Sequence, residues 1–164
     1  MASLLRKIRR TRWDKQIFAS TMPWLPHGDM AADPLGDLAT VNGAISVFEV
    51  PNPDFAQYIA AAIAAGGDAL SNVDYIVFDS EILDPTSVKI EKAPGDSPAP
   101  DINELHRHIA EISAARLLAI ARLIFEKGTT NRISHKILRP IIEDGVKNKQ
   151  WTVKPKLKQC LTSR

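Results

Sequence analysis

Residues 44–50 (AISVFEV) and 73–79 (VDYIVFD) are rich in β-branched and aromatic side chains, and an alanine-rich segment lies between them. Both stretches have the composition of strands. Asn52 is suited to cap a helix, Pro53 suits the first helical position, and Gly66-Gly67 is a typical helix end. The 22 residues between Val50 and Val73 suffice for a right-handed crossover between parallel strands. The sequence therefore predicts a strand–helix–strand unit.

Residues 87–92 (SVKIEK) alternate between polar and apolar side chains and predict a third, edge strand. Residues 93–100 (APGDSPAP) contain three prolines and predict a proline-rich loop. Together these segments indicate a small mixed sheet of about three strands, within an α/β segment that covers residues 40–92.

The remaining segments predict helices around this sheet. Residues 101–127 predict a long helix with Asp101 as its cap and Gly128 at its end, and a further helix follows within residues 131–144, so that residues 101–144 form a helical segment. Residues 1–20 predict a basic amphipathic helix, and residues 145–164 a basic tail. Trp24 is expected to cover part of the core. The expected fold is a single α+β domain over residues 1–164.

Composition excludes several classes of protein. The 164 residues include 45% hydrophobic and 24% charged side chains, which is typical of a globular domain and not of a collagenous or fully disordered chain. No apolar run approaches the length of a membrane span. Cys160 is the single cysteine, which favours a reducing compartment. We therefore expect a cytoplasmic protein.

Charge is segregated along the chain. Residues 1–15 carry a net charge of +5, residues 16–105 carry −12 and residues 106–164 carry +9, which together make the net +2. One interpretation is that the basic ends dock on the acidic middle. The other is that the ends bind an anionic partner such as nucleic acid. The docking interpretation is favoured.

The candidates for catalysis are sparse. Asp79, Glu81 and Asp84 follow a predicted strand and form a candidate metal site for a metal-dependent hydrolase. The sequence contains no glycine-rich phosphate loop, no G-x-S-x-G motif and no H-E-x-x-H motif. Arg116 falls within the apolar stripe of the predicted long helix, so we expect it to be buried and bonded to an acid, such as Asp79 or Glu81, or to backbone carbonyls. No cofactor is expected, and a non-enzymatic role is favoured over an enzymatic one.

The sequence favours two functions, and both depend on binding. The first is a non-enzymatic interaction or regulatory protein that acts through a surface for a protein partner or for a second copy of the chain. The alternative is a nucleic-acid-binding protein with a helix-turn-helix-like basic segment near the C-terminus. The residues expected to contact nucleic acid are Arg132, Lys136, Arg139, Lys154 and Lys156.

Overall fold

A six-stranded antiparallel sheet forms the centre of the computed structural model, which describes residues 2–163. The order of the strands is β4-β5-β2-β1-β3-β6, and every neighbouring pair is antiparallel. The α+β class is confirmed, whereas the expectation of about three strands in a mixed sheet was wrong. The strands are β1 (Ser3–Ile8), β2 (Ile45–Val50), β3 (Val73–Asp79), β4 (Lys89–Lys92), β5 (His106–Ala110) and β6 (Thr129–Ile133).

The predicted strand–helix–strand unit is present as β2, α2 (Phe55–Ala65) and β3. β2 and β3 run in the same direction because each is antiparallel to β1, which lies between them. The unit is thus a split β-α-β motif, with the first strand of the chain inserted into it. Because β1 comes from before the unit in sequence, local patterns do not reveal this insertion.

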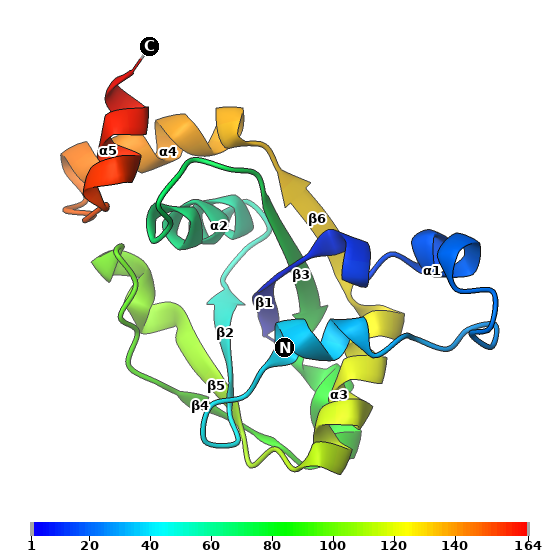
Figure 1. Cartoon of the computed structure of the whole chain (residues 1–164). Coiled ribbons are helices and arrows are strands. Elements are labelled where there is room, and N and C mark those ends of the chain that lie inside the picture. Colours follow the sequence, from blue (N-terminus) through cyan, green and yellow to red (C-terminus); the bar gives the residue numbers. More distant parts are fainter. Residues whose placement is uncertain (1, 164) are drawn as a thin grey trace.

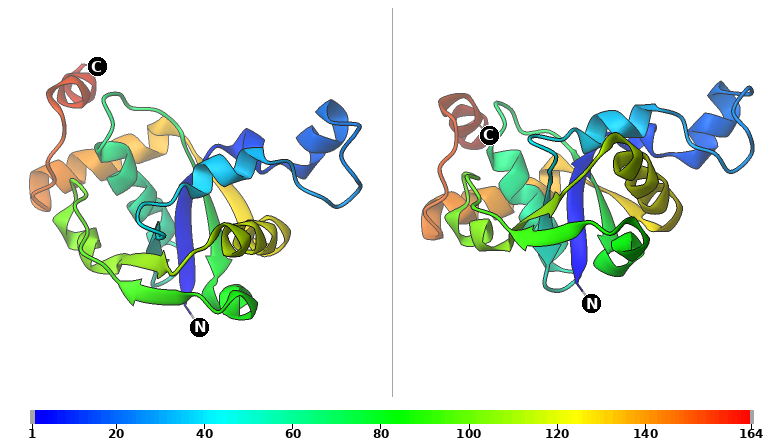
Figure 2. Two further views of the ribbon diagram at one scale, coloured as in Figure 1. Left: turned by 60° about the horizontal axis from the view of Figure 1, so that its bottom comes forward. Right: turned by 90° about the horizontal axis from the view of Figure 1, so that it is seen from below.

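Helices cover both faces of the sheet (Figures 1 and 2). On one face, α2 and α4 (His135–Asn148) enclose a core that includes Leu5 and Ile59. On the other face, α3 (Ala114–Lys127) and the 3₁₀ helix η2 (Asp33–Leu38) enclose a second core that includes Leu4. The alanines of α2 allow its backbone to lie close to the strands, and most of them are fully buried.

The prediction of a basic helix over residues 1–20 was wrong. β1 occupies the centre of the sheet, and Leu4 and Leu5 are buried on its opposite faces. A strand that is covered on both faces lacks simple alternation, so its adjacent leucines also fit a helix. The 3₁₀ helix η1 (Arg10–Arg12) follows, and after it comes the short α-helix α1 (Lys15–Thr21), which Asp14 caps.

The prediction of one helix over residues 101–127 was also wrong. The 3₁₀ helix η4 (Pro100–Leu105) leads into β5, and α3 begins only at Ala114, after Ser113 as its cap. Glu111 adopts a left-handed backbone conformation (φ 61°) that no continuous helix accommodates. The end of α3 before Gly128 agrees with the prediction. The expected helical segment 101–144 therefore contains two strands, β5 and β6.

The C-terminal tail is partly helical. α4 continues through Pro140 to Asn148, and α5 (Pro155–Thr162) follows with Leu157 buried. The proline-rich residues 93–100 form no strand, and Ser97 is hydrogen-bonded to Asn103 there. Across residues 2–163, no helix has both the length and the apolar character that a membrane crossing needs.

Candidate partner-binding surface

The expected helix-turn-helix does not form. The segment between α3 and α4 is the strand β6, so the two helices are separated by a sheet element and not by a short turn. Arg132 lies on β6, where its guanidinium binds both carboxylate oxygens of Asp74 at 2.7 and 3.1 Å.

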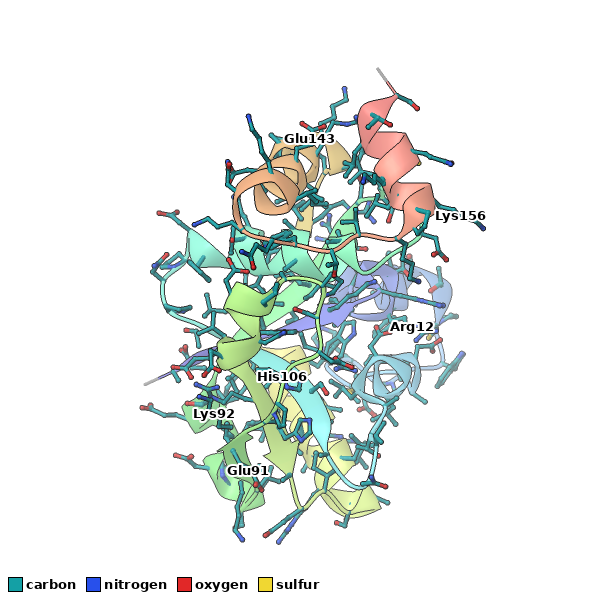
Figure 3. All side chains as sticks on the ribbon, turned by 90° about the vertical axis from the view of Figure 1, so that its left-hand side faces the viewer. Arg12, Glu91, Lys92, His106, Glu143 and Lys156 are labelled. Carbon is teal, nitrogen blue, oxygen red and sulfur yellow. The ribbon has the colours of Figure 1, made fainter. Side chains whose placement is uncertain are left out.

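The other four predicted nucleic-acid contacts lie on or near α4 and α5. Arg139 donates to the backbone carbonyls of Cys160 and Leu161, at 3.0 Å each. Lys154 pairs with Asp68 at 3.1 Å. Lys136 and Lys156 are exposed, and Figure 3 shows Lys156 pointing outward from α5. The five side chains thus do not gather into one surface on a recognition helix.

Ion pairs connect the basic ends of the chain to its acidic middle. This agrees with the docking interpretation of the charge segregation. The pairs that span these regions are Arg12–Asp37, Arg107–Glu49, Arg122–Asp29, Arg132–Asp74 and Lys154–Asp68.

The acidic residues proposed as a metal site do not converge. Asp79 accepts a hydrogen bond from Ser3 at 3.0 Å, while Glu81 and Asp84 lie exposed on the 3₁₀ helix η3 (Ser80–Thr86). Within residues 2–163, no three histidine, cysteine, aspartate or glutamate side chains lie together as a metal site requires.

Arg116 was expected to be buried, and it is only half-buried on the first turn of α3. Its guanidinium donates to the backbone carbonyl of Glu111 at 2.7 Å, which agrees with the expected bond to backbone carbonyls, whereas neither Asp79 nor Glu81 is its partner. The predicted helix began at residue 101, whereas α3 begins at Ala114. The apolar stripe of the predicted helix therefore does not exist, and Arg116 does not lie within it. The more deeply placed arginine is Arg6 on β1, whose pKa is lowered by burial.

A groove lies beside α1, which projects with the following loop from the body of the protein (Figures 1 and 2). This α1 groove has a volume of about 370 Å³ and lies between α1, the loop of residues 22–29 and the end of α3. Its lining residues are Lys15, Phe18, Ala19, Met22, Pro23, Leu25, Pro26, His27, Gly28, Asp29, Phe125 and Glu126.

Aromatic packing holds the floor of the α1 groove. The rings of Phe18 and Phe125 stack with their centroids 5.7 Å apart, and the ammonium group of Lys15 lies 5.2 Å from the centroid of the Phe125 ring. Asp29 in the loop pairs with Arg122 on α3 at 3.3 Å. These contacts tie α1 and its loop to α3, so the groove is built on a helix of the central fold.

Trp24 lies on this loop with 72% of its surface exposed. The expectation that Trp24 covers the core was wrong, because Trp13 and Trp151 are the buried tryptophans. Exposed tryptophan is costly in water and is enriched at the centres of protein interfaces. Sequence reasoning missed the groove, although Trp24 between Pro23 and Pro26 was the signal that could have located it.

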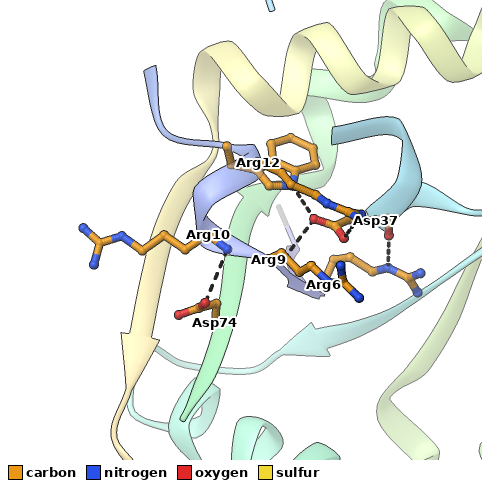
Figure 4. Close-up of polar contacts among 7 residues, drawn as sticks. Arg6, Arg9, Arg10, Arg12, Asp37 and Asp74 are labelled. Carbon is orange, nitrogen blue, oxygen red and sulfur yellow. Dashed lines mark hydrogen bonds and ion pairs between the residues drawn. The ribbon is translucent and has the colours of Figure 1, made fainter. Parts of the chain in front are cut away.

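Asp37 anchors the chain that leads into α1. Its carboxylate accepts hydrogen bonds from the backbone N–H of Arg9 at 2.9 Å, from Arg12 at 2.9 Å and from the indole N–H of Trp13 at 3.0 Å (Figure 4). Its backbone carbonyl accepts a further bond from Arg6. η1 is therefore fixed to η2, which carries Asp37, before the chain enters α1.

No protein-family model matches this chain, and no curated protein or solved structure matches it either.

Proposed function

We propose that this protein is a non-enzymatic interaction or regulatory protein that acts through a surface for a protein partner, and that the α1 groove with Trp24 is that surface. The proposal is carried by the exposed Trp24 side chain on a loop whose adjacent residues, Pro23 and Leu25, line a groove with an aromatic floor; Trp24 itself is not part of that lining. A partner segment with a large apolar side chain would bury Trp24 and fill the groove, and such anchors dominate the energy of most interfaces. The free, exposed Cys160 is in keeping with a cytoplasmic location.

Photo-crosslinking tests this proposal in cells of the source organism. A benzoylphenylalanine placed at position 24 is expected to capture a discrete protein partner. Phe18→Asp, which places a charge in the groove, is expected to abolish this capture because the charge would have to be buried. The matched control carries the crosslinker at Val41, a side chain that is 75% exposed and remote in sequence from the α1 groove.

The comparison between these variants decides the outcome. Capture of the same protein from positions 24 and 41, or capture that survives Phe18→Asp in a folded protein, would contradict a specific surface at the α1 groove. Circular dichroism of the Phe18→Asp protein checks its fold, because Phe18 is buried in the core.

Nucleic-acid binding stands as a second candidate function. It is supported by exposed lysines on α4, α5 and their connection, namely Lys136, Lys147, Lys149, Lys156 and Lys158. Affinity for a duplex is then expected to fall steeply with salt concentration, because each neutralised phosphate releases counterions. Binding of a duplex with no dependence on salt, or no binding at low salt, would remove this candidate.

A further inference from the structure

We propose that the free edge of β6 binds an extended, acidic segment of the partner protein by strand addition. In this arrangement one partner side chain enters a neutral pocket on the α2 side of the sheet, and the next, acidic side chain enters a basic pocket beside Arg10. The inference rests on the proposed function, because the basic pocket shares Lys15 and Phe125 with the α1 groove.

The direction of the backbone groups in β3 follows from one hydrogen bond. Ser80 donates its N–H to the carbonyl of Ala2 at 2.9 Å, so this pair marks where β3 and β1 exchange hydrogen bonds. In an antiparallel ladder, successive residues turn their N–H and C=O groups to opposite neighbours. Counting back from Ser80, the residues of β3 that turn toward β6 are Val73, Tyr75 and Val77.

The register of β6 then shows which of its groups are free. Ile133, Asn131 and Thr129 lie opposite these three residues and complete the ladder with β3. The backbone N–H and C=O groups of Thr130 and Arg132 therefore point away from the sheet. β6 is the outermost strand on this side (Figure 1), so these groups are the positions where an added strand would bond.

The two edge strands of the sheet, β4 and β6, differ in how well their side chains prevent pairing with a further strand. On β4, all four residues are exposed, and Lys89 and Lys92 pair with Glu111 and Glu104. Charged side chains of this kind, especially lysines, prevent strands from pairing at an edge. On β6, the only charged residue is Arg132, and its guanidinium is drawn onto Asp74 of β3. The β6 edge thus lacks the charged side chains that protect β4.

A pocket of about 390 Å³ lies on the α2 side of β6 and is lined by Thr129 and Asn131 of that strand. This α2-side pocket contains the hydroxyl-bearing Tyr75 but no charged side chain among its lining residues. Tyr75 is 6% exposed, and burial raises the pKa of its phenol, which therefore stays protonated. Apolar walls with a hydroxyl group suit a neutral partner side chain. The main apolar wall residues are Val50, Pro53, Ala56 and Val77.

The opposite face of β6 carries a basic pocket of about 320 Å³, lined by Gly128 and Thr130 of this region together with Arg10 and Lys15. We call it the Arg10 pocket. The one carboxylate in its lining, Asp14, already accepts hydrogen bonds from two backbone N–H groups as the cap of α1. The lining therefore contains two cations, Arg10 and Lys15, against one carboxylate, and this net positive charge favours an acidic side chain.

Arg10 has the geometry of a binding side chain. Its backbone N–H is held by Asp74 at 3.3 Å, while Figure 4 shows its guanidinium pointing away from Asp74 and past β6. A planar guanidinium is well suited to bind a carboxylate through two parallel hydrogen bonds. Because successive side chains of a strand point to opposite faces, a segment added to β6 would present alternate side chains to the two pockets.

Charge also decides between a foreign segment and a second copy of the chain. Pairing of two β6 strands about a two-fold axis would bring the Arg10 side chains of both copies to one edge, where Arg132 is already paired with Asp74 and Asp74 is not free to offset them. Like charges across neighbouring strands are destabilising. An acidic segment of another protein avoids this repulsion and pairs with Arg10.

Peptide binding to the full chain tests the inference. The probe is a fluorescein-labelled peptide in which glutamate alternates with valine, and its counterpart carries lysine in place of glutamate. We expect the acidic peptide to bind at least about tenfold more tightly, as measured by fluorescence anisotropy. Failure of the acidic peptide to bind, or equal binding of both peptides, would overturn the inference.

Two pairs of variants locate the site. Arg10→Ala is expected to weaken binding of the acidic peptide by about three- to tenfold, whereas Arg9→Ala, which removes the neighbouring exposed arginine outside the pocket, leaves it unchanged. Thr130→Pro removes the outward N–H and is expected to weaken binding by about tenfold or more, whereas Thr130→Val keeps the N–H and the binding. Equal effects of Arg10→Ala and Arg9→Ala would overturn the inference, even if Thr130→Pro fails to fold.

Amide hydrogen exchange separates strand addition from binding in the pockets alone. The amides of Thr130 and Arg132 are expected to become protected when the acidic peptide binds, because both would donate to the added strand. Unchanged exchange at both amides in the bound state would overturn strand addition. If a labelled DNA duplex binds at the same edge more tightly than the acidic peptide, the inference of a peptide ligand is overturned in favour of nucleic acid. Capture at Trp24 is a separate measurement, so the proposed function can survive the failure of this inference.

Discussion

Replacing Asp37 with alanine is expected to destabilise the protein strongly, because this carboxylate holds three donors together. Its side chain is 8% exposed, and it accepts from the backbone of Arg9, from Arg12 and from the indole of Trp13. Trp13 is almost completely buried. In the alanine variant, its N–H loses its partner in a place that water reaches poorly.

The size of the effect follows from these contacts. A hydrogen bond to a charged group contributes roughly 1.5–3 kcal/mol, which applies to the bonds from Arg9 and Trp13. The pair with Arg12 contributes less, about 0–1 kcal/mol, because the Arg12 side chain is 28% exposed. The bonds share one acceptor and do not add fully. We therefore expect a loss of about 4 kcal/mol, within the roughly 3–5 kcal/mol typical of breaking a buried charged pair.

Urea denaturation measures this loss. With a slope of about 2 kcal/mol per molar urea, the midpoint of the Asp37→Ala protein is expected to fall by about 2 M. Asp33→Ala, which removes an exposed carboxylate from the start of the same 3₁₀ helix η2, should change the free energy of unfolding by no more than about 0.5 kcal/mol. A shift below about 0.5 M for Asp37→Ala, or equal shifts for both variants, would refute the role of Asp37 as an anchor.

Three further predictions follow from single contacts. Gly145→Ala is expected to destabilise the protein by about 1–3 kcal/mol, because the added Cβ would overlap the ring of Trp151. Thermal unfolding measures this loss, and an unchanged melting temperature would contradict the packing of Trp151 on Gly145. Burial lowers the pKa of His106, so the unfolded chain binds a proton at this residue first, and the free energy of unfolding falls as the pH drops below about 6.5. His106→Gln should make the free energy of unfolding depend less on pH in this range. An unchanged dependence on pH would contradict the role of His106. Arg132 lowers the pKa of Asp74, so this pair stabilises the fold at neutral pH and its contribution declines as the pH falls below about 3.9. Arg132→Gln should reduce stability at pH 7 and reduce it by less at pH 2, and an equal loss at both values would exclude the ion pair as the cause.

The sequence predicts the elements whose signals are local. α2 begins at Phe55, two residues after Pro53, so the prediction of Pro53 as its first residue was wrong, although Asn52 accepts a hydrogen bond from the N–H of Phe55. The helix ends before Gly66-Gly67 and its alanines pack on the sheet as predicted. β2 and β3 are apolar, β-branched and bounded by turns, and α3 ends before Gly128 as predicted. In each case the residues that start and stop the element lie within it or directly beside it.

The elements that were missed depend on distant partners. β5 (HRHIA) resembles part of a polar helix, yet Arg107 pairs with Glu49 of β2, and the ring of His106 packs on Phe48. β1 carries Arg6 among its leucines, and this guanidinium is satisfied by the backbone carbonyls of Asp37 and Ser46. Both strands carry charge that becomes acceptable only after the sheet has assembled. Because these partners are distant in the sequence, the periodicity of the residues does not reveal them.

The arginines that support the fold differ in their contacts from Arg10, whose side chain is available to a partner. Arg6 donates to two backbone carbonyls, and Arg12 is bound to Asp37. Arg132 is bound to Asp74. Arg10 differs because Asp74 fixes its backbone while its guanidinium extends past β6. A charged side chain on a fixed backbone loses less conformational entropy on binding than one on a mobile loop. Ion pairs such as Arg12–Asp37 and Arg132–Asp74 therefore use part of the segregated charge within the fold, whereas Arg10 at the edge of β6 stays available to an acidic partner segment.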